Sequence, residues 1–176
     1  IMVTAISSKN SARGARRTSF KTYDAAMKYL LSHTDYEQML RVRYNKDTFS
    51  LTRMKALLKG LKDPQKSLRC VHIAGTKGKG STATMLATML EACGHKVGLY
   101  TSPHLVEIRE RIRINGDVIT QAALTRHINA VIRQVEKMGD DKPTFFELFT
   151  AIAFLEFAAQ NVDVAVLETG LGGRLD

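Results

Sequence analysis

The chain has 176 residues, of which 44% are apolar and 24% are charged. This length fits one ordinary domain, and this composition is typical of a folded globular protein rather than a disordered one. No apolar run approaches the roughly 20 residues that a membrane-spanning helix needs, so we expect no membrane partner.

The positive charge of the chain, formally +9, is concentrated at its beginning. Residues 1–22 hold five lysines and arginines and no acid, whereas residues 23–176 hold 21 basic and 17 acidic groups. Trp is absent. Lysines and arginines that bind phosphates and carboxylates explain the small remaining excess better than nucleic-acid binding does, so we expect no nucleic-acid partner.

Residues 1–20 are predicted to form a disordered basic extension. The stretch is rich in Ser, Arg and Ala and has no continuous apolar segment, which excludes a secretory signal. Its composition also fits an organellar transit peptide, and both interpretations stay open beside a cytoplasmic location. Cys70 and Cys93, the only cysteines, are predicted to be reduced and partly buried, which favours a reducing compartment.

The order of helices and strands predicts the fold class. Apolar residues recur at three- and four-residue steps in the predicted helices, which cover residues 23–31, 51–61, 81–92, 124–135 and 145–159. Predicted strands cover residues 70–74, 97–101, 112–114, 118–119 and 162–167, with a two-residue hairpin turn at Asn115-Gly116. The helix at 81–92 has large apolar residues on one face, which are Met85, Leu86, Met89 and Leu90. This alternation predicts an α/β fold, a mostly parallel sheet with helices on both faces and ligands at the carboxyl ends of its strands.

A glycine-rich loop joins the first predicted strand, which we expect to be buried, to the helix at 81–92. The loop reads Gly75-Thr76-Lys77-Gly78-Lys79-Gly80-Ser81-Thr82. Glycines let a backbone approach its ligand closely, and N–H groups at a helix amino terminus attract phosphate oxygens. A loop lysine adds a positive charge, and a hydroxyl at the helix start can face a magnesium ion. We interpret this stretch as an ATP-binding phosphate loop (P-loop) in which Lys79 neutralises phosphate charge.

Two familiar glycine patterns do not fit this loop. The dinucleotide-binding pattern needs a glycine at the position of Lys77 and an acid near the end of the next strand, which reads Tyr100-Thr101. The conventional Walker A pattern needs a glycine where Ile73 stands and a Ser or Thr where Gly80 stands. A tight turn with surface lysines is the remaining alternative, and the density of glycine and lysine after an apolar strand argues against it.

Four motifs in order carry a family resemblance. They are the loop at residues 75–81, the segment Thr101-Ser102-Pro103-His104-Leu105 followed by residues 110–116, the segment Thr144-Phe145-Phe146-Glu147, and residues 167–176. The loop resembles that of Mur-type ATP-dependent amide ligases. Together the motifs resemble folylpolyglutamate and dihydrofolate synthases over about residues 20–176, and four motifs in order are far more specific than one.

This resemblance implies a Mur-ligase-like P-loop ATPase domain over residues 21–176, incomplete at its carboxyl end, with the family's second ligase domain absent. We therefore expect an amino-terminal fragment that is inactive by itself. The implied reaction is ATP-dependent addition of L-glutamate to folate, or to dihydropteroate, through an acyl phosphate. The implied cofactors are ATP and Mg²⁺, the partners are these small molecules, and we expect a monomer.

The resemblance also implies roles for single residues. Lys79 and Glu168 would be catalytic, and Ser102 and Glu168 would bind Mg²⁺. The pterin or folate would contact a set that comprises Thr144, Phe145, Phe146, Glu147, Leu175 and Asp176. One stretch near the folate site departs from the family pattern. It reads Thr48-Phe49-Ser50-Leu51-Thr52-Arg53, and it keeps only the Leu and the Arg of that pattern.

Purely structural interpretations stand beside these roles. Ser102 could cap the turn before Pro103, and Glu168 could pair with Arg174. Thr144 and Glu147 have the spacing of a capping box, and this structural role is compatible with substrate contact. His104 is expected to pack in its loop rather than bind a ligand.

Two other functions compete with folate-dependent ligation. A Mur-type ligase could act on another carboxylate, although residues 110–116 and 145–147 argue against a cell-wall precursor. The chain could also be a non-catalytic Mg-ATP-binding fragment.

Overall fold

The computed structural model describes residues 19–33, 51–139, 141–170 and 173. The predicted basic extension up to residue 18, residues 48–50 of the departing stretch, and Arg174, Leu175 and Asp176 lie outside the described residues.

A five-stranded sheet forms the centre of the fold, in the order β1-β5-β2-β3-β4. Its strands are β1 (Cys70–Ile73), β2 (Val97–Tyr100), β3 (Ile112–Ile114), β4 (Asp117–Val118) and β5 (Val164–Glu168). β1, β5 and β2 are parallel, while β3 and β4 add an antiparallel hairpin beside β2. Ile73 is level with Glu168, so the parallel strands end at one common edge.

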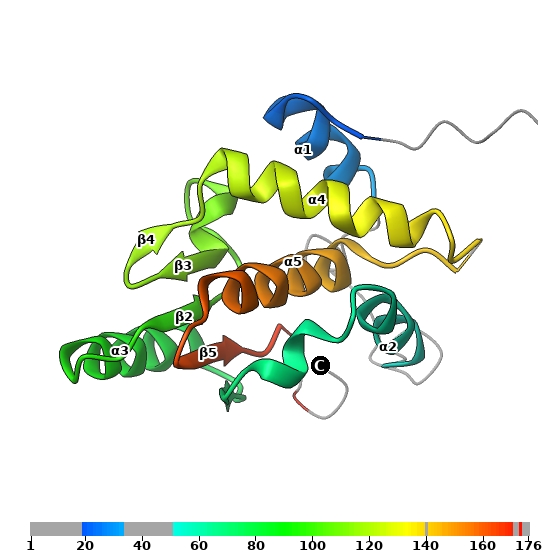
Figure 1. Ribbon diagram of the computed structural model, residues 1–176. Coiled ribbons are helices and arrows are strands. Elements are labelled where there is room, and N and C mark those ends of the chain that lie inside the picture. Colours follow the sequence, from blue (N-terminus) through cyan, green and yellow to red (C-terminus); the bar gives the residue numbers. More distant parts are fainter. Residues whose placement is uncertain (1–18, 34–50, 140, 171–172, 174–176) are drawn as a thin grey trace, which may run out of the picture.

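Helices cover both faces of this sheet, as the sequence predicted (Figure 1). α3 (Lys79–Ala92) packs on one face, and α5 (Phe145–Gln160) packs on the other. α4 (Gln121–Val135) lies over α5, and α1 (Tyr23–Leu31) lies against α4. α2 (Leu51–Gly60) contacts both α4 and α5. The α/β fold with two covered faces is therefore confirmed, with a parallel part of three strands.

The larger part of the core lies between α5, α4 and the sheet. It includes the fully buried Phe149, Ile152 and Phe157 of α5. α5 approaches β2 so closely that a Cβ atom on Gly98 would lie 2.6 Å from Cδ1 of Phe157. Only glycine fits at this position without moving the Phe157 ring.

Local sequence signals place several element ends correctly. The hairpin turn at Asn115 and Gly116 has positive φ at both residues, 47° and 80°, as a two-residue turn of this type requires. Thr144 and Glu147 form the predicted capping box at the start of α5. Gly94, just past α3, has a φ of 89°, the left-handed backbone that favours glycine.

Three expectations about burial were wrong. β1 was expected to be buried, but Cys70, Val71 and His72 are exposed, because β1 is an edge strand. Cys93 is also exposed, so both cysteines are free and exposed rather than partly buried.

The predicted apolar face of α3 packs on the core only in part, because Leu86 and Leu90 are half-buried against it while the two methionines are exposed. Ala83 and Ala87 are buried against the sheet, whereas Met85 and Met89 are 58% and 65% exposed. Each Met lies two residues beyond a buried Ala, which is about 200° around the helix. The small alanines let α3 lie close to the sheet.

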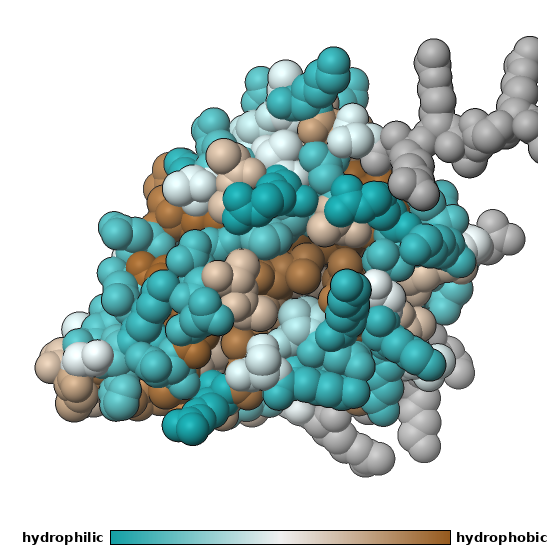
Figure 2. Space-filling view, viewed as in Figure 1, coloured by the Kyte–Doolittle hydropathy of each residue, from teal (hydrophilic) through white to brown (hydrophobic). Residues whose placement is uncertain are grey.

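The face of the molecule seen in Figure 2 is mainly hydrophilic, with smaller hydrophobic areas between polar side chains. Among the described residues, the helices are too short or too polar to cross a membrane.

Candidate phosphate- and cation-binding site

The glycine-rich loop connects the carboxyl end of β1 to the amino terminus of α3. Gly78 is the residue before the helix, with a φ of 74°, and no side chain caps the first turn of α3. Four backbone N–H groups at a helix start have no partner inside the helix, and they carry its positive dipole end. This amino terminus therefore offers uncapped donors where the sequence predicts a phosphate.

The loop residues are open to solvent. Gly75, Thr76, Lys77 and Gly78 are exposed, while Lys79 is half-buried. The helix begins at Lys79, two residues earlier than predicted, so Lys79 stands in its first turn. The hydroxyl of Thr82 donates to the Gly78 carbonyl at 2.9 Å and is thereby used within the helix.

Glu168, at the carboxyl end of β5, lies against this helix start. Its carboxylate is buried, and a Cβ atom on Gly80 would lie 3.3 Å from Oε2 and 3.4 Å from Oε1. The backbone N–H of Ser102, which follows β2, donates to Oε2 of Glu168 at 3.0 Å. Three segments distant in sequence thus meet at one carboxylate.

The donors gathered here fit a magnesium ion better than a softer metal. Among the described residues, no group of three or more His, Cys, Asp and Glu side chains could hold a metal. Mg²⁺ commonly takes only one or two protein oxygens and completes its shell with waters and substrate phosphates. A single carboxylate beside a serine and a phosphate-binding helix start matches that pattern.

The start of α5 lies at the same edge of the sheet. Phe146 packs on Gly170, where a Cβ atom would lie 2.7 Å from its ring, and near Tyr100 at 6.1 Å between ring centroids. Phe145 is almost fully buried, with its ring against the Arg111 guanidinium at 5.3 Å. Of these two predicted substrate residues, Phe146 is the less buried, since it is only half-buried.

Glu147 is already engaged by the protein. Its Oε2 accepts hydrogen bonds from the backbone N–H of Thr144 and from Nε of Arg53, both at 2.8 Å. Arg53 also pairs with Asp141 at 3.3 Å. The sequence pointed to Arg53 through the family pattern, but nothing in the spacing predicted its partners, which lie 88 and 94 positions away.

Glu110 orders the loop that follows Ser102. Its carboxylate accepts hydrogen bonds from the backbone N–H groups of Leu105, Glu107 and Val106, which hold the pKa of Glu110 below its usual value. His104 accepts a hydrogen bond from Nε of Arg111 at 3.1 Å, which agrees with its expected packing role.

Comparison with known proteins identifies folylpolyglutamate and dihydrofolate synthases as relatives of this chain. No model of a protein family matches the chain. A probable bifunctional folylpolyglutamate synthase/dihydropteroate synthase of Halobacterium salinarum is 49% identical over 123 residues, which is 68% of this chain and 15% of the relative. A dihydrofolate synthase/folylpolyglutamate synthase of Bacillus subtilis is 44% identical over 130 residues, which is 72% of this chain and 30% of the relative.

Solved structures agree with the sequence relatives. An FPGS–AMPPCP–folate complex superposes with a TM-score of 0.78 at 38% identity, over 88% of this chain and 37% of that chain. The chain thus spans less than a third of these two relatives and little more than a third of that structure. In its matched part, this chain belongs to the family of folylpolyglutamate and dihydrofolate synthases.

Proposed function

We propose that residues 21–176 form the P-loop ATP-binding domain of a ligase that adds L-glutamate to a folate. The observation that carries this proposal is the meeting of the uncapped amino terminus of α3, Ser102 and the buried Glu168 at the carboxyl ends of β1, β2 and β5. The named activity of the relatives and the AMPPCP and folate of the solved complex support the same assignment.

ATP would bind with its phosphates at the glycine-rich loop. The backbone N–H groups from Thr76 to Ser81 would donate to the phosphate oxygens, and Lys79 would neutralise charge on the β- and γ-phosphates. Glu168 and Ser102 would hold magnesium. When bound, magnesium would supply positive charge that offsets the negative charge of the phosphates and the acceptor.

The chemistry that this site would serve activates a carboxylate. The acceptor carboxylate attacks the γ-phosphorus of ATP, which forms an acyl phosphate and releases ADP. The glutamate amine then attacks the acyl carbon, the amide bond forms and phosphate leaves. The chain's own contribution is to hold the phosphates and neutralise their charge, which is how most phosphoryl transfer is catalysed.

The acceptor would lie at the start of α5. The half-buried Phe146, whose ring lies beside Gly170, supports contact with a flat pterin. Thr144, Phe145 and Glu147 would hold this helix start in place, since they are used in the cap, the core and the Arg53 ion pair. Tetrahydrofolate and dihydropteroate are both acceptors of the required chemistry. We also propose a monomer, and the free cysteines support a reducing, cytoplasmic compartment.

A thermal-shift titration tests the nucleotide part of the proposal. Mg-AMPPCP should raise the melting temperature of the chain in a concentration-dependent way, because a ligand that binds only the folded state stabilises it. Lys79→Ala should remove most of the shift, while Lys55→Ala, an exposed lysine of α2, should retain it. No shift in the unchanged chain would refute the proposal.

A second titration separates a ligase domain from a nucleotide-binding unit without a substrate site. Tetrahydrofolate or dihydropteroate, added on top of Mg-AMPPCP, should raise the melting temperature further. Phe146→Ala should remove this second shift and keep the first. Stabilisation by the nucleotide alone would favour the nucleotide-binding unit.

A further inference from the structure

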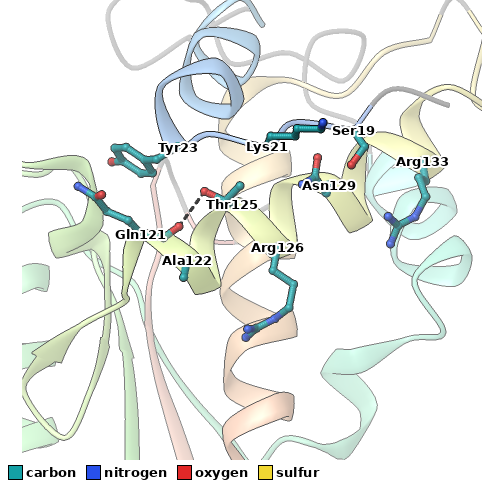
Figure 3. Close-up of a pocket in the computed structure, with 9 residues that line it drawn as sticks. All are labelled: Ser19, Lys21, Tyr23, Gln121, Ala122, Thr125, Arg126, Asn129 and Arg133. Carbon is teal, nitrogen blue, oxygen red and sulfur yellow. Dashed lines mark hydrogen bonds between the residues drawn. The ribbon is translucent and has the colours of Figure 1, made fainter. Parts of the chain in front are cut away.

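A second candidate site lies far from the glycine-rich loop, along the outer face of α4. It is a groove of about 620 Å³, lined by α4 and by the residues that precede and begin α1 (Figure 3). α4 packs on α5, which packs on the sheet, and α3 covers the opposite face of the sheet. A ligand in this groove would therefore be separate from the proposed ATP site.

One wall of the groove is fixed by a two-sided hydrogen bond. Asn129 of α4 accepts from the backbone N–H of Phe20 at 2.7 Å and donates to the carbonyl of Phe20 at 2.9 Å. Phe20 also packs its ring on Tyr29 of α1, at 5.5 Å between ring centroids. The extended segment that carries Ser19 and Lys21 is thus held across α4.

The groove is strongly cationic. Lys21, Arg126 and Arg133 line it, and among the described residues no acidic side chain does. Arg126 lies 3.8 Å from the buried Glu156, near the limit of an ion pair, and its own side chain is 62% exposed, so its guanidinium stays open to a ligand. Within the described part of the chain, Lys21 and Arg133 make no ion pair.

The positions of the cations favour an extended ligand. Arg126 and Arg133 are seven residues apart on α4, which places them about 10 Å apart along the helix axis. Their guanidinium groups and the Lys21 ammonium do not point to one common position (Figure 3). Cationic groups that point to different positions suit a chain with several anionic groups better than a single phosphate.

We propose that this groove binds a linear polycarboxylate, namely a γ-linked oligoglutamate chain. Arginine presents a planar pair of donors that matches a carboxylate, and such charge-assisted hydrogen bonds are stronger than neutral ones. Tyr23, Gln121 and Thr125 add neutral polar groups beside the cations, which suit the amide bonds between the carboxylates. The choice of oligoglutamate rests on the proposed function, because repeated glutamate ligation would build such a chain. The charge and the shape of the groove are observed independently of the proposed function.

Calorimetric titration with free tetra-γ-glutamate at low ionic strength tests this proposal. We expect binding that weakens as salt is added, since salt screens exposed charges. The double variant Arg126→Ala, Arg133→Ala should weaken binding by about tenfold or more, because each lost charge-assisted bond contributes strongly. The control is the double variant Lys28→Ala, Lys55→Ala, which removes the same charge from exposed positions outside the groove. It should change the affinity less than about twofold.

Several outcomes would overturn the proposal. The first is that tetra-γ-glutamate does not bind. The second is that the double alanine variant of the groove and its control lose the same affinity. The third is that inorganic triphosphate, or a single-stranded RNA of equal charge, binds more tightly than tetra-γ-glutamate. Arg126→Lys, Arg133→Lys keeps the charge and the fold but loses the planar donor pair, and its affinity should lie between that of the unchanged chain and that of the double alanine variant. Mg-AMPPCP binding, measured on the same protein, separates the two proposals. If the nucleotide binds and tetra-γ-glutamate does not, the groove proposal fails while the proposed ligase function stands.

Discussion

The carboxylate of Glu168 accepts a hydrogen bond from the backbone N–H of Ser102 at 3.0 Å, across 66 positions of sequence. This contact joins the ends of two neighbouring parallel strands, β5 and β2. Gly80 completes the arrangement from the side of α3, because only a residue without a Cβ leaves the carboxylate ample room there. Glu168 is therefore held at a defined position beside the helix start.

Lys79→Ala should weaken Mg-AMPPCP binding by about tenfold or more, because a charge-assisted hydrogen bond to phosphate is lost. The fold should not change, since Lys79 is outside the hydrophobic core. In a full-length relative carrying the same loop, the rate of ligation should fall by about 10²–10³-fold. Isothermal titration gives the affinity, and an affinity equal to that of the unchanged chain would contradict the phosphate-loop assignment.

Glu168→Gln should mainly impair the use of magnesium. The amide retains the size of the side chain and can still accept from Ser102, but it lacks the charge that a hard cation prefers. The measurement is AMPPCP affinity with and without Mg²⁺, and the gain that Mg²⁺ provides should shrink. Glu91→Gln, on α3 away from the loop, should keep the full gain. If Mg²⁺ still raised the AMPPCP affinity of Glu168→Gln by the full amount, the role of Glu168 would be structural only.

Gly98→Ala should destabilise the protein by about 1–3 kcal/mol, because its Cβ would meet the buried Phe157 ring and force it to move. Gly60→Ala is a matched control. There the added Cβ would meet Oε1 of Gln134, the end of a side chain that can rotate away. Urea unfolding gives both free energies, and equal values would show that α5 does not press on β2 in solution.

His127→Leu should destabilise the protein by about 1–3 kcal/mol at pH 7, because it leaves the buried Glu156 without its closest partner. His127 Nε2 lies 2.6 Å from Oε2 of Glu156. His95→Leu, at an exposed position, should stay within about 0.5 kcal/mol. Urea unfolding of the two variants measures the difference.

The same pair predicts an acid dependence. Burial disfavours the charged form of Glu156, but hydrogen bonds from His127 and Gln160 outweigh it and lower the pKa of the carboxyl. A carboxyl whose pKa is lower in the folded state stabilises the protein above its unfolded pKa, about 4.3, and this contribution disappears as the pH falls through the folded value. The free energy of unfolding should therefore decline below about pH 4.3, and less steeply in His127→Leu than in the unchanged chain. If the free energy of unfolding of the two proteins fell in the same way with pH, the contact with His127 would not be the cause of the low pKa of Glu156.

Local patterns in the sequence predicted the elements well because each has a nearby signal. The start of α1, the hairpin at Asn115 and the cap at Thr144 all follow from residues within a few positions. Burial was harder to predict. The apolar run of β1 reads like a central strand, and only the strand order reveals that it is at the edge.

The candidate site could likewise be predicted only in part. The loop before α3 and the acid that ends β5 could be found from single motifs, since both stand at strand ends. The contacts that hold the site together could not, because they join residues far apart in sequence, as Arg53 and Glu147 do. The cationic groove on α4 was also missed, since Lys21 was considered only in the charge count of residues 1–22 and its neighbours in the groove belong to another segment.

The outer side of β1 affects how the protein behaves at high concentration. In the described part of the chain, this strand has one neighbour, and the exposed Val71, Met85 and Met89 lie on it and on α3. A strand edge with open N–H and C=O groups is a template on which another chain can add, and apolar side chains nearby favour such pairing. The monomer that we propose should therefore self-associate once it is concentrated, and Val71→Lys should keep it dispersed, because a charged edge discourages strand addition.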